Sequence, residues 1–391
     1  MNICIINQHT LNYGDDIAGI SLIDRLLYLA EKEKKEIKIN ILYNSANRLN
    51  YNDRRVVHSE EVKLKKMGFF NIFLVLFFGF FGFEYQPNRY VQEFNEIIKK
   101  SDYVLVAPGG ANIGIYKDWR YLVRLLMVVN LKKRLIFHNN TIGKSNNLLF
   151  NFLSRRILKK SDLYVREKKS LSLLNNMGIS AIRTVDTGFL FNNVEESSID
   201  LKDYFIFIPT SIQSWHPDFK SFRVDDVINN YVLPSFVDLA KEKSKKVVIL
   251  AHLNGSLSES SLLESYRDRM IKLGMNKENV FIPTLNSCYD YDNYIKKSDY
   301  VVSMRYHGVV MAIKNKINFL SLSYENKMDE VCYYSGFFEH NLGIKQINKE
   351  SIDIMKRIYN SIPDSAHWDL KLTDLTRKAA ICTDQLFFRE N

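Results

Sequence analysis

Short apolar runs rich in β-branched residues alternate with helix-like stretches along the whole chain. They are NICIIN, IKINILYN, DYVLVAPGG, RLIFHNN, DLYVRE and AIRTVD in the first half, and YFIFIPT, KVVILAH, NVFIP, DYVVSM and INFLSLS in the second. Runs that are apolar on both faces and separated by helices are typical of parallel sheets covered on both sides. A polar stretch over residues 191–203 divides the two series. The pattern therefore predicts an α/β protein with two Rossmann-like doubly wound domains.

The length of the chain fits this division. Its 391 residues, of which 46% are apolar, provide enough material for two cores. We expect an N-terminal domain over residues 1–195, a C-terminal domain over residues 200–360 and a helical segment over residues 361–391.

The net charge indicates which kinds of partner the protein binds, and the cysteines indicate its cellular compartment. A net charge of +10 favours anionic partners, such as nucleic acid, an anionic membrane face or a phosphorylated small molecule. Nucleic acid is disfavoured because the phenylalanine cluster lies apart from the lysine runs, whereas such a partner needs interleaved aromatic and basic residues. The four cysteines form no CxxC pair and no signal-peptide pattern opens the sequence. These features predict a cytoplasmic protein.

One apolar segment, FFNIFLVLFFGFFGF over residues 69–83, has eight phenylalanines and no charge. As a helix it would reach about 22 Å, which is short of the roughly 30 Å of a hydrocarbon core. It belongs to an insertion expected over residues 67–85. Two interpretations stay open: a buried helix or helical hairpin, or a patch that enters one membrane leaflet with Lys63, Lys65 and Lys66 on the headgroups.

Polar residues and glycines are concentrated at the junctions between predicted strands and the helices that follow them. Ligands of open parallel sheets bind beyond the carboxyl ends of the strands. Four such junctions carry unusual residues: NQHTLNYGDD (7–16), APGGANIGIY (107–116), HLNGS (252–256) and MRYHGVV (304–310).

The last of these junctions has the composition of an anion site. With a helix beginning near Gly308, its first N–H groups and its positive dipole end would lie beside Arg305 and His307. A strand-end arginine can simply pair with a carboxylate, and a lone histidine is usually structural. The three features together, however, suit a phosphate or carboxylate ligand.

The same residues carry a family resemblance. SMRYHGVVMAIKNKINFLSLSYENK resembles the C-terminal signature of polysaccharide pyruvyl transferases, in which Arg-x-His-Gly leads a helix, followed by a strand and Tyr-x-x-Lys. NYGDDIAGISL resembles the Asn-x-Gly-Asp opening loop of that family, and APGGANIG resembles its Gly-Gly loop. YVREKKSLSLLNNMG with VDTGFLF resembles its Arg-Glu segment and the aspartate beyond. HNNTIG (138–143) and Tyr306 depart from the family pattern.

This resemblance implies two domains of the GT-B type with the active site in the cleft between them. It implies transfer of a pyruvyl group from phosphoenolpyruvate to a sugar of a polysaccharide or lipid-linked saccharide precursor, usually as a ketal. Phosphoenolpyruvate would be the donor substrate, and no cofactor is expected. Peripheral contact with the anionic inner membrane face would suit such an acceptor.

The resemblance also assigns roles to residues. Phosphoenolpyruvate carries a phosphate and a carboxylate, so two cationic anchors are needed. Arg305 and the helix terminus at Gly308 would hold one anion, while Arg166 and Lys327 are candidates for the other.

The proton transfers of the reaction point to two further residues. His307 is the expected general acid/base, since the unperturbed pKa of histidine lies near working pH. Asp15 would orient or deprotonate an acceptor hydroxyl; capping of a helix that starts near Ile17 is the alternative. The other residues expected to contact substrate are Tyr306, Asn12, Gly14, Gly109, Gly110 and Asn112.

Other functions are less well supported by the sequence. The eight histidines include no HxH, HxxH or HxxxH pair, and no acidic cluster suggests a magnesium site, so we expect no metal. A GT-B-type glycosyltransferase that uses a nucleotide sugar is the main alternative. A non-catalytic, membrane-associated component of a polysaccharide assembly complex is a further one.

Overall fold

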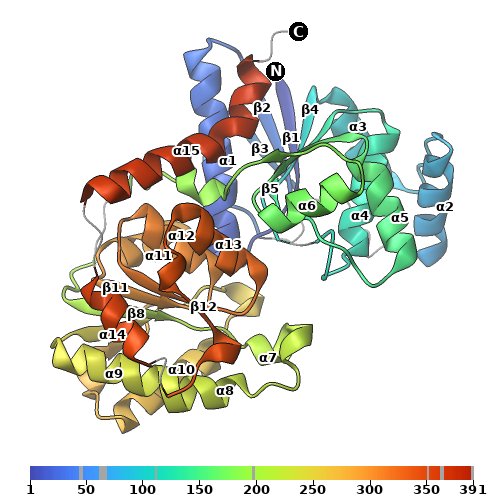
Figure 1. Ribbon diagram of the computed structural model, residues 1–391. Helices are drawn as coiled ribbons and strands as arrows, with labels where there is room; N and C mark the ends of the chain where they lie inside the picture. Colours follow the sequence, from blue (N-terminus) through green and yellow to red (C-terminus); the bar gives the residue numbers. More distant parts are fainter. Residues whose placement is uncertain are drawn as a thin grey trace. The chain divides into compact units, whose positions relative to one another are not determined.

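The computed structural model describes residues 1–43, 47–60, 68–110, 112–195, 199–349, 352–361 and 365–388. The chain forms two compact units (Figure 1). Unit 1 comprises Met1–Thr10, Ala18–Phe191 and the chain from Arg377 onward, and unit 2 comprises Leu11–Ile17 and Asn192–Thr376. The passage between the units after Phe191 lies close to the expected boundary, but the opening loop groups with unit 2 and the end of the chain with unit 1.

Unit 1 is built on a seven-stranded parallel sheet with the order β3-β2-β1-β4-β5-β6-β7. Its strands are β1 (Asn2–Gln8), β2 (Lys38–Tyr43), β3 (Val56–Glu60), β4 (Tyr103–Val106), β5 (Leu135–Asn140), β6 (Ser161–Val165) and β7 (Ile182–Arg183). Its helices are α1 (Tyr13–Lys32), α2 (Phe69–Phe80), α3 (Arg89–Lys100), α4 (Trp119–Asn130), α5 (Leu148–Leu158) and α6 (Lys168–Asn176). Helix α4 is apolar on nearly all sides and is buried from Tyr121 to Val129, so it forms the centre of one helical layer.

Unit 2 is built on a six-stranded parallel sheet with the order β10-β9-β8-β11-β12-β13. Its strands are β8 (Tyr204–Ile208), β9 (Lys246–Ile249), β10 (Val280–Phe281), β11 (Tyr300–Ser303), β12 (Phe319–Ser323) and β13 (Asn341–Gly343). Its helices are α7 (Ile212–Trp215), α8 (Val224–Val227), a π turn η4 (Ile228–Val232), α9 (Leu233–Glu242), α10 (Ser260–Lys272), α11 (Cys288–Lys296), α12 (Tyr306–Lys314), α13 (Asn326–Ser335) and α14 (Ile352–Asn360). The long α15 (Ser365–Phe388) begins in unit 2 and ends in unit 1.

The order of the strands creates one reversal in each sheet. In unit 2 the chain winds outward from β8 to β10, returns to place β11 beside β8, and then winds the other way. In unit 1 the same reversal lies between β1 and β4. Because the connections leave a crevice at such a switch point, it is the expected ligand site of each sheet.

Every strand expected from the sequence is present, and the α/β class with two Rossmann-like doubly wound domains is confirmed. Two edge strands, β3 and β13, were not expected. Both candidate helices begin earlier than expected. Helix α1 starts at Tyr13 because the Asn12 side chain accepts the backbone N–H groups of Gly14 (2.9 Å) and Asp15 (3.4 Å). Helix α12 starts at Tyr306, with Arg305 as the residue that precedes its first turn.

The phenylalanine-rich segment forms helix α2, which packs on α4 at the outside of unit 1 (Figure 1). The interpretation of this segment as a core helix is wrong, because most of its phenylalanines are exposed. Of the helices that the structure describes, none combines the length and the apolar character needed to cross a bilayer.

Candidate functional site

Arg305 and His307 lie at the carboxyl end of β11, on one side of the switch point of unit 2. Both are buried, with 8% and 6% of their surface exposed. The Ser303 hydroxyl accepts the N–H of Arg305 (3.0 Å) and donates to its carbonyl (2.8 Å), which fixes the turn into α12. A side chain on Gly308 would lie 2.3 Å from the Ser303 hydroxyl, so this glycine is needed for the close packing of α12 on the strand.

The opening loop of the chain reaches the same place. Tyr13 donates its backbone N–H to the His252 carbonyl (3.1 Å), and Asn12 forms an antiparallel bridge with Leu253. A Cβ placed on Gly14 would lie 2.1 Å from Nδ1 of His307, so only glycine allows the loop to approach this ring. Three of the four junctions singled out in the sequence therefore meet in unit 2.

The ring of His252 packs against the ring of His307. The two rings are stacked with centroids 6.1 Å apart, and Nδ1 of His252 lies 3.0 Å from the Tyr291 hydroxyl. Burial and the nearby positive charges of Arg305, His307 and Lys327 hold the pKa of His252 well below its ordinary value. His252 is therefore neutral, and it lies beside a cluster of cations.

Arg305 forms an ion pair with the carboxylate of Glu259. Glu259 accepts a hydrogen bond from its guanidinium. The same carboxylate accepts the backbone N–H (3.0 Å) and the hydroxyl (2.9 Å) of Ser211, and the hydroxyl of Thr210 (3.3 Å). Thr210 and Ser211 follow β8, so these donors come from both sides of the switch point. They form a cradle with the chemistry to hold an oxyanion.

Lys327 adds a further positive charge to the cluster and lies beside the ring of Tyr306. Nζ of Lys327 lies 5.9 Å from the centroid of the Tyr306 ring and forms an ion pair with Glu325 (2.6 Å). The Tyr306 hydroxyl is 3.2 Å from that of Tyr334. The positive charge of Lys327 is one of the causes that lower the pKa of His252.

Arg166 has a different environment from Arg305 and Lys327. It lies in unit 1, almost fully buried, and forms an ion pair with Asp186 (2.6 Å). Its Nε donates to the hydroxyl of Thr141 (3.1 Å), which donates to Glu167 (2.6 Å). This network joins the HNNTIG segment to the two segments after it, and the charge of Arg166 is balanced within it.

The Gly-Gly loop lies at the switch point of unit 1. Gly109 and Gly110 follow β4, and the Gly109 carbonyl accepts the N–H of Thr141 (3.2 Å). The side-chain nitrogen of Asn112 is 3.5 Å from Nε2 of His9, which follows β1. Apart from Arg166, which follows β6, the predicted substrate-contacting residues thus fall into two groups, one at each switch point.

In a comparison against protein-family models, residues 12–326 match the family described as polysaccharide pyruvyl transferase. The chain belongs to this family. Membership indicates a transferase that acts on a saccharide acceptor. No curated protein matches the chain significantly.

Solved structures show the same fold in proteins of distant sequence. A UDP-GlcNAc 2-epimerase from Methanocaldococcus jannaschii superimposes with a TM-score of 0.60 at 13% identity, over 99% of this chain and 100% of that one. The UDP-GlcNAc 2-epimerase of Neisseria meningitidis, bound to UDP-GlcNAc, gives 0.54 at 13% identity, over 99% of both chains. A Listeria monocytogenes protein described as a candidate UDP-N-acetylglucosamine 2-epimerase gives 0.61 at 12% identity, over 100% and 97%. At these identities the likeness shows the fold alone, and it confirms the expected GT-B-like class of this pyruvyl transferase family member.

Three residues of the candidate site were not predicted from the sequence. Thr210 and Ser211 follow β8, and the rule that ligands bind beyond strand ends could have pointed to them. Glu259 lies in a loop 46 positions from its partner Arg305, and no pattern in the sequence links the two.

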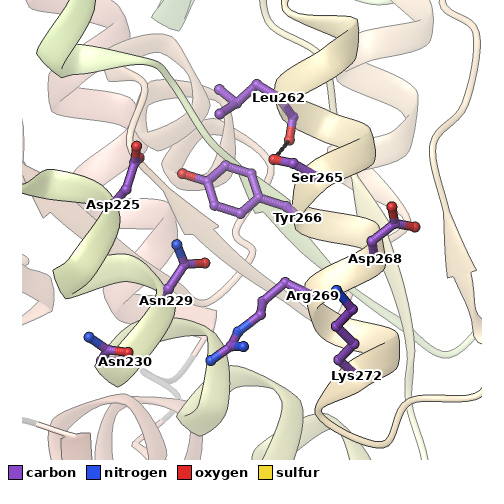
Figure 2. Close-up of a pocket in the computed structure, with 9 residues that line it drawn as sticks. All are labelled: Asp225, Asn229, Asn230, Leu262, Ser265, Tyr266, Asp268, Arg269 and Lys272. Atoms are coloured by element: carbon purple, nitrogen blue, oxygen red, sulfur yellow. Dashed lines mark hydrogen bonds between the residues drawn. The ribbon is translucent and has the colours of Figure 1, made fainter.

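A polar cavity of about 430 Å³ lies elsewhere in unit 2, between α8 and η4 on one side and α10 on the other (Figure 2). Its lining residues are Asp225, Asn229, Asn230, Leu262, Ser265, Tyr266, Asp268, Arg269 and Lys272. None of them belongs to the cluster at the switch point, so this cavity is not the candidate site.

Asp16, next to the predicted catalytic Asp15, has an unusual environment in the first turn of α1. Burial, with the adjacent charge of Asp15, raises the pKa of Asp16 from 3.8 to about 8. One of its carboxylate oxygens, Oδ1, is buried and has no hydrogen-bond partner among the described residues. Asp16 is therefore protonated in the folded chain at neutral pH.

We expect Asp16→Asn to stabilise the protein increasingly as pH rises. The folded-state pKa lies above the unfolded value, so the wild type loses stability as pH rises from about 4 towards 8, and asparagine removes that loss. Thermal melts at pH 5 and pH 8.5 should show a small difference at the lower pH and a gain for the variant at the higher one. Asp268→Asn, at an exposed position of α10, should show no such trend. Equal effects at both pH values would contradict the raised pKa.

Proposed function

We propose that this chain transfers a pyruvyl group from phosphoenolpyruvate to a saccharide and forms a ketal across two hydroxyls. The observation that carries the proposal is the cluster of Arg305, His307 and the first turn of α12 at the switch point of unit 2. Family membership supports the reaction class. Together, the two features suit a doubly anionic donor and a group that can move protons.

The cradle around Glu259 suggests how the donor is held. Its carboxylate lies where Arg305, Ser211 and Thr210 donate together, and an oxyanion of phosphoenolpyruvate has the same hydrogen-bonding requirements. We propose that the donor shares or takes over these contacts. Lys327 is the better candidate for the second anchor, because it lies beside Tyr306 in the same unit as Arg305, whereas Arg166 belongs to a buried network of unit 1.

The chemistry needs two proton movements that His307 and Asp15 can serve. One acceptor hydroxyl adds to C2 of phosphoenolpyruvate while C3 takes up a proton and becomes a methyl group. The second hydroxyl then displaces phosphate from the same carbon, and its proton leaves with the phosphate. In this proposal His307 delivers the proton to C3, and Asp15 receives a proton from an acceptor hydroxyl.

Neutral His252 fits the role proposed for His307. A second charged imidazolium stacked at 6.1 Å would disfavour protonation of His307, whereas a neutral ring does not. We therefore propose His252 as a positioning residue for His307.

The acceptor in this proposal is a sugar of a polysaccharide or of a lipid-linked precursor. Gly109, Gly110 and Asn112 at the switch point of unit 1 are proposed to contact it, because that loop presents backbone groups and one amide at the end of β4. No cofactor is part of the proposal.

We expect phosphoenolpyruvate to bind the free protein, and the affinity to fall as salt is raised, because ions screen the attraction between the two anions and the site cations. Calorimetric titration at low and high ionic strength measures the affinity for phosphoenolpyruvate and its dependence on salt. UDP-GlcNAc is the comparison ligand. Absence of phosphoenolpyruvate binding by folded protein at low salt would remove the proposal, and binding of UDP-GlcNAc alone would favour a nucleotide-sugar enzyme.

A further inference from the structure

Helix α2 presents an apolar face that no described part of unit 1 covers. Phe70, Phe73, Phe77 and Phe80 on the helix, with Phe81 and Phe83 just beyond it, are between 45% and 69% exposed. The opposite side of the helix is anchored: Val75 is buried, and a side chain on Gly79 would lie 1.9 Å from the amide of Asn130 on α4. Exposed apolar surface of this extent is a mark of an interaction site.

The exposed face continues onto α5. Leu148, Phe152 and Arg156 are spaced four residues apart and so share one side of that helix. Leu148 and Phe152 are 85% and 58% exposed. Arg156 donates to the Phe80 carbonyl (2.6 Å), and its guanidinium lies 4.2 Å from the Phe80 ring centroid. Contact through Arg156 therefore joins the two helices into one surface, which we call the α2–α5 face (Figure 1).

The sequence around the α2–α5 face is strongly basic. Residues 144–160, which include α5, contain five lysines and arginines and no acid. Lys63, Lys65 and Lys66, which the sequence placed on the headgroups, lie outside the described residues. Apolar side chains flanked by cations are the pattern of a surface that binds anionic lipid.

We propose that the α2–α5 face docks on an anionic lipid bilayer, with its phenylalanines at the boundary of headgroups and acyl chains and its basic residues on the phosphates. The 12-residue α2 is about 18 Å long, which is too short to cross a hydrocarbon core of roughly 30 Å. A second copy of the chain fits less well, because a two-fold interface would bring the basic residues of segment 144–160 of both copies together.

Vesicle flotation of the full chain tests this proposal. We expect vesicles of phosphatidylcholine with phosphatidylglycerol to capture the protein, phosphatidylcholine vesicles to capture much less, and raised salt to weaken capture. The triple variant Phe73→Ser, Phe77→Ser and Phe81→Ser should lower capture at least tenfold. Phe338→Ser, a change at a 64% exposed phenylalanine of unit 2, should leave it unchanged.

A charge variant tests the basic residues of segment 144–160 and leaves the phenylalanines of the α2–α5 face unchanged. Arg155→Glu with Lys159→Glu should abolish the preference for phosphatidylglycerol. Capture unaffected by both variants, or no capture by either vesicle, would overturn the proposal. Concentration-dependent dimerisation that the phenylalanine variant abolishes, without vesicle binding, would show a second copy as the partner. Phosphoenolpyruvate binding should persist in all these variants, so the result does not depend on the proposed reaction.

Discussion

Replacing His307 with glutamine is expected to lower turnover about 10² to 10⁴-fold while phosphoenolpyruvate affinity stays nearly intact. Glutamine keeps much of the size and hydrogen bonding of histidine but cannot exchange protons near neutral pH. His307 lies at the switch point of unit 2 with its ring between Gly14 and His252, so it has the position for proton transfer. Phosphate release under saturating donor, with calorimetry for affinity, separates the two quantities.

His340→Gln is the matched control for that variant. His340 is another buried histidine of unit 2, and its Nδ1 lies 2.9 Å from the Phe319 carbonyl, where a structural role is sufficient. Turnover should not change once thermal melts show equal folding. Near-normal turnover of folded His307→Gln would make His307 a structural group and direct the search for the acid/base to Asp15 and Asp16.

Arg305→Lys is expected to weaken phosphoenolpyruvate binding about 10- to 100-fold, although the charge is kept. Lysine cannot present the planar fork through which arginine holds an oxyanion, and its shorter reach disturbs the cradle shared with Glu259. Titration calorimetry at low salt measures the change directly.

Arg267→Lys gives the comparison for Arg305. Arg267 pairs with Glu264 (2.8 Å) on α10, and the exchange there should leave donor affinity as it was. Equal affinities for wild type and a folded Arg305→Lys variant would show that the donor binds elsewhere. We thus expect Arg305→Lys to weaken donor binding and His307→Gln to lower turnover.

The strands could be predicted because buried parallel strands leave a strong apolar signal. The two that were not expected, β3 with the sequence VVHSE and β13 with NLG, lie at sheet edges and carry polar or small residues. Helix starts were placed late for a local reason. The Asn12 side chain caps α1 ahead of Asp15, which was the alternative cap for a helix expected to start near Ile17.

The site was partly predictable because strand order determines where loops meet. The sequence pointed to the junctions near 12, 252 and 305, and the structure brings these three together in unit 2. It could not show that Arg166 has its charge balanced by Asp186, or that Glu259 lies on Arg305, because both pairings depend on tertiary contacts. Exposure of the α2 phenylalanines was equally hidden, since a buried and a membrane-facing helix have the same composition.

The most direct test of the proposed transfer is the mass of the acceptor after reaction. Extracted polysaccharide and lipid-linked saccharides are incubated with the protein and phosphoenolpyruvate, and the products are analysed by mass spectrometry alongside an assay for phosphate. The account predicts an acceptor heavier by one pyruvic acid less one water, with one phosphate released for each group transferred. Consumption of a nucleotide sugar without any pyruvyl increment would contradict it.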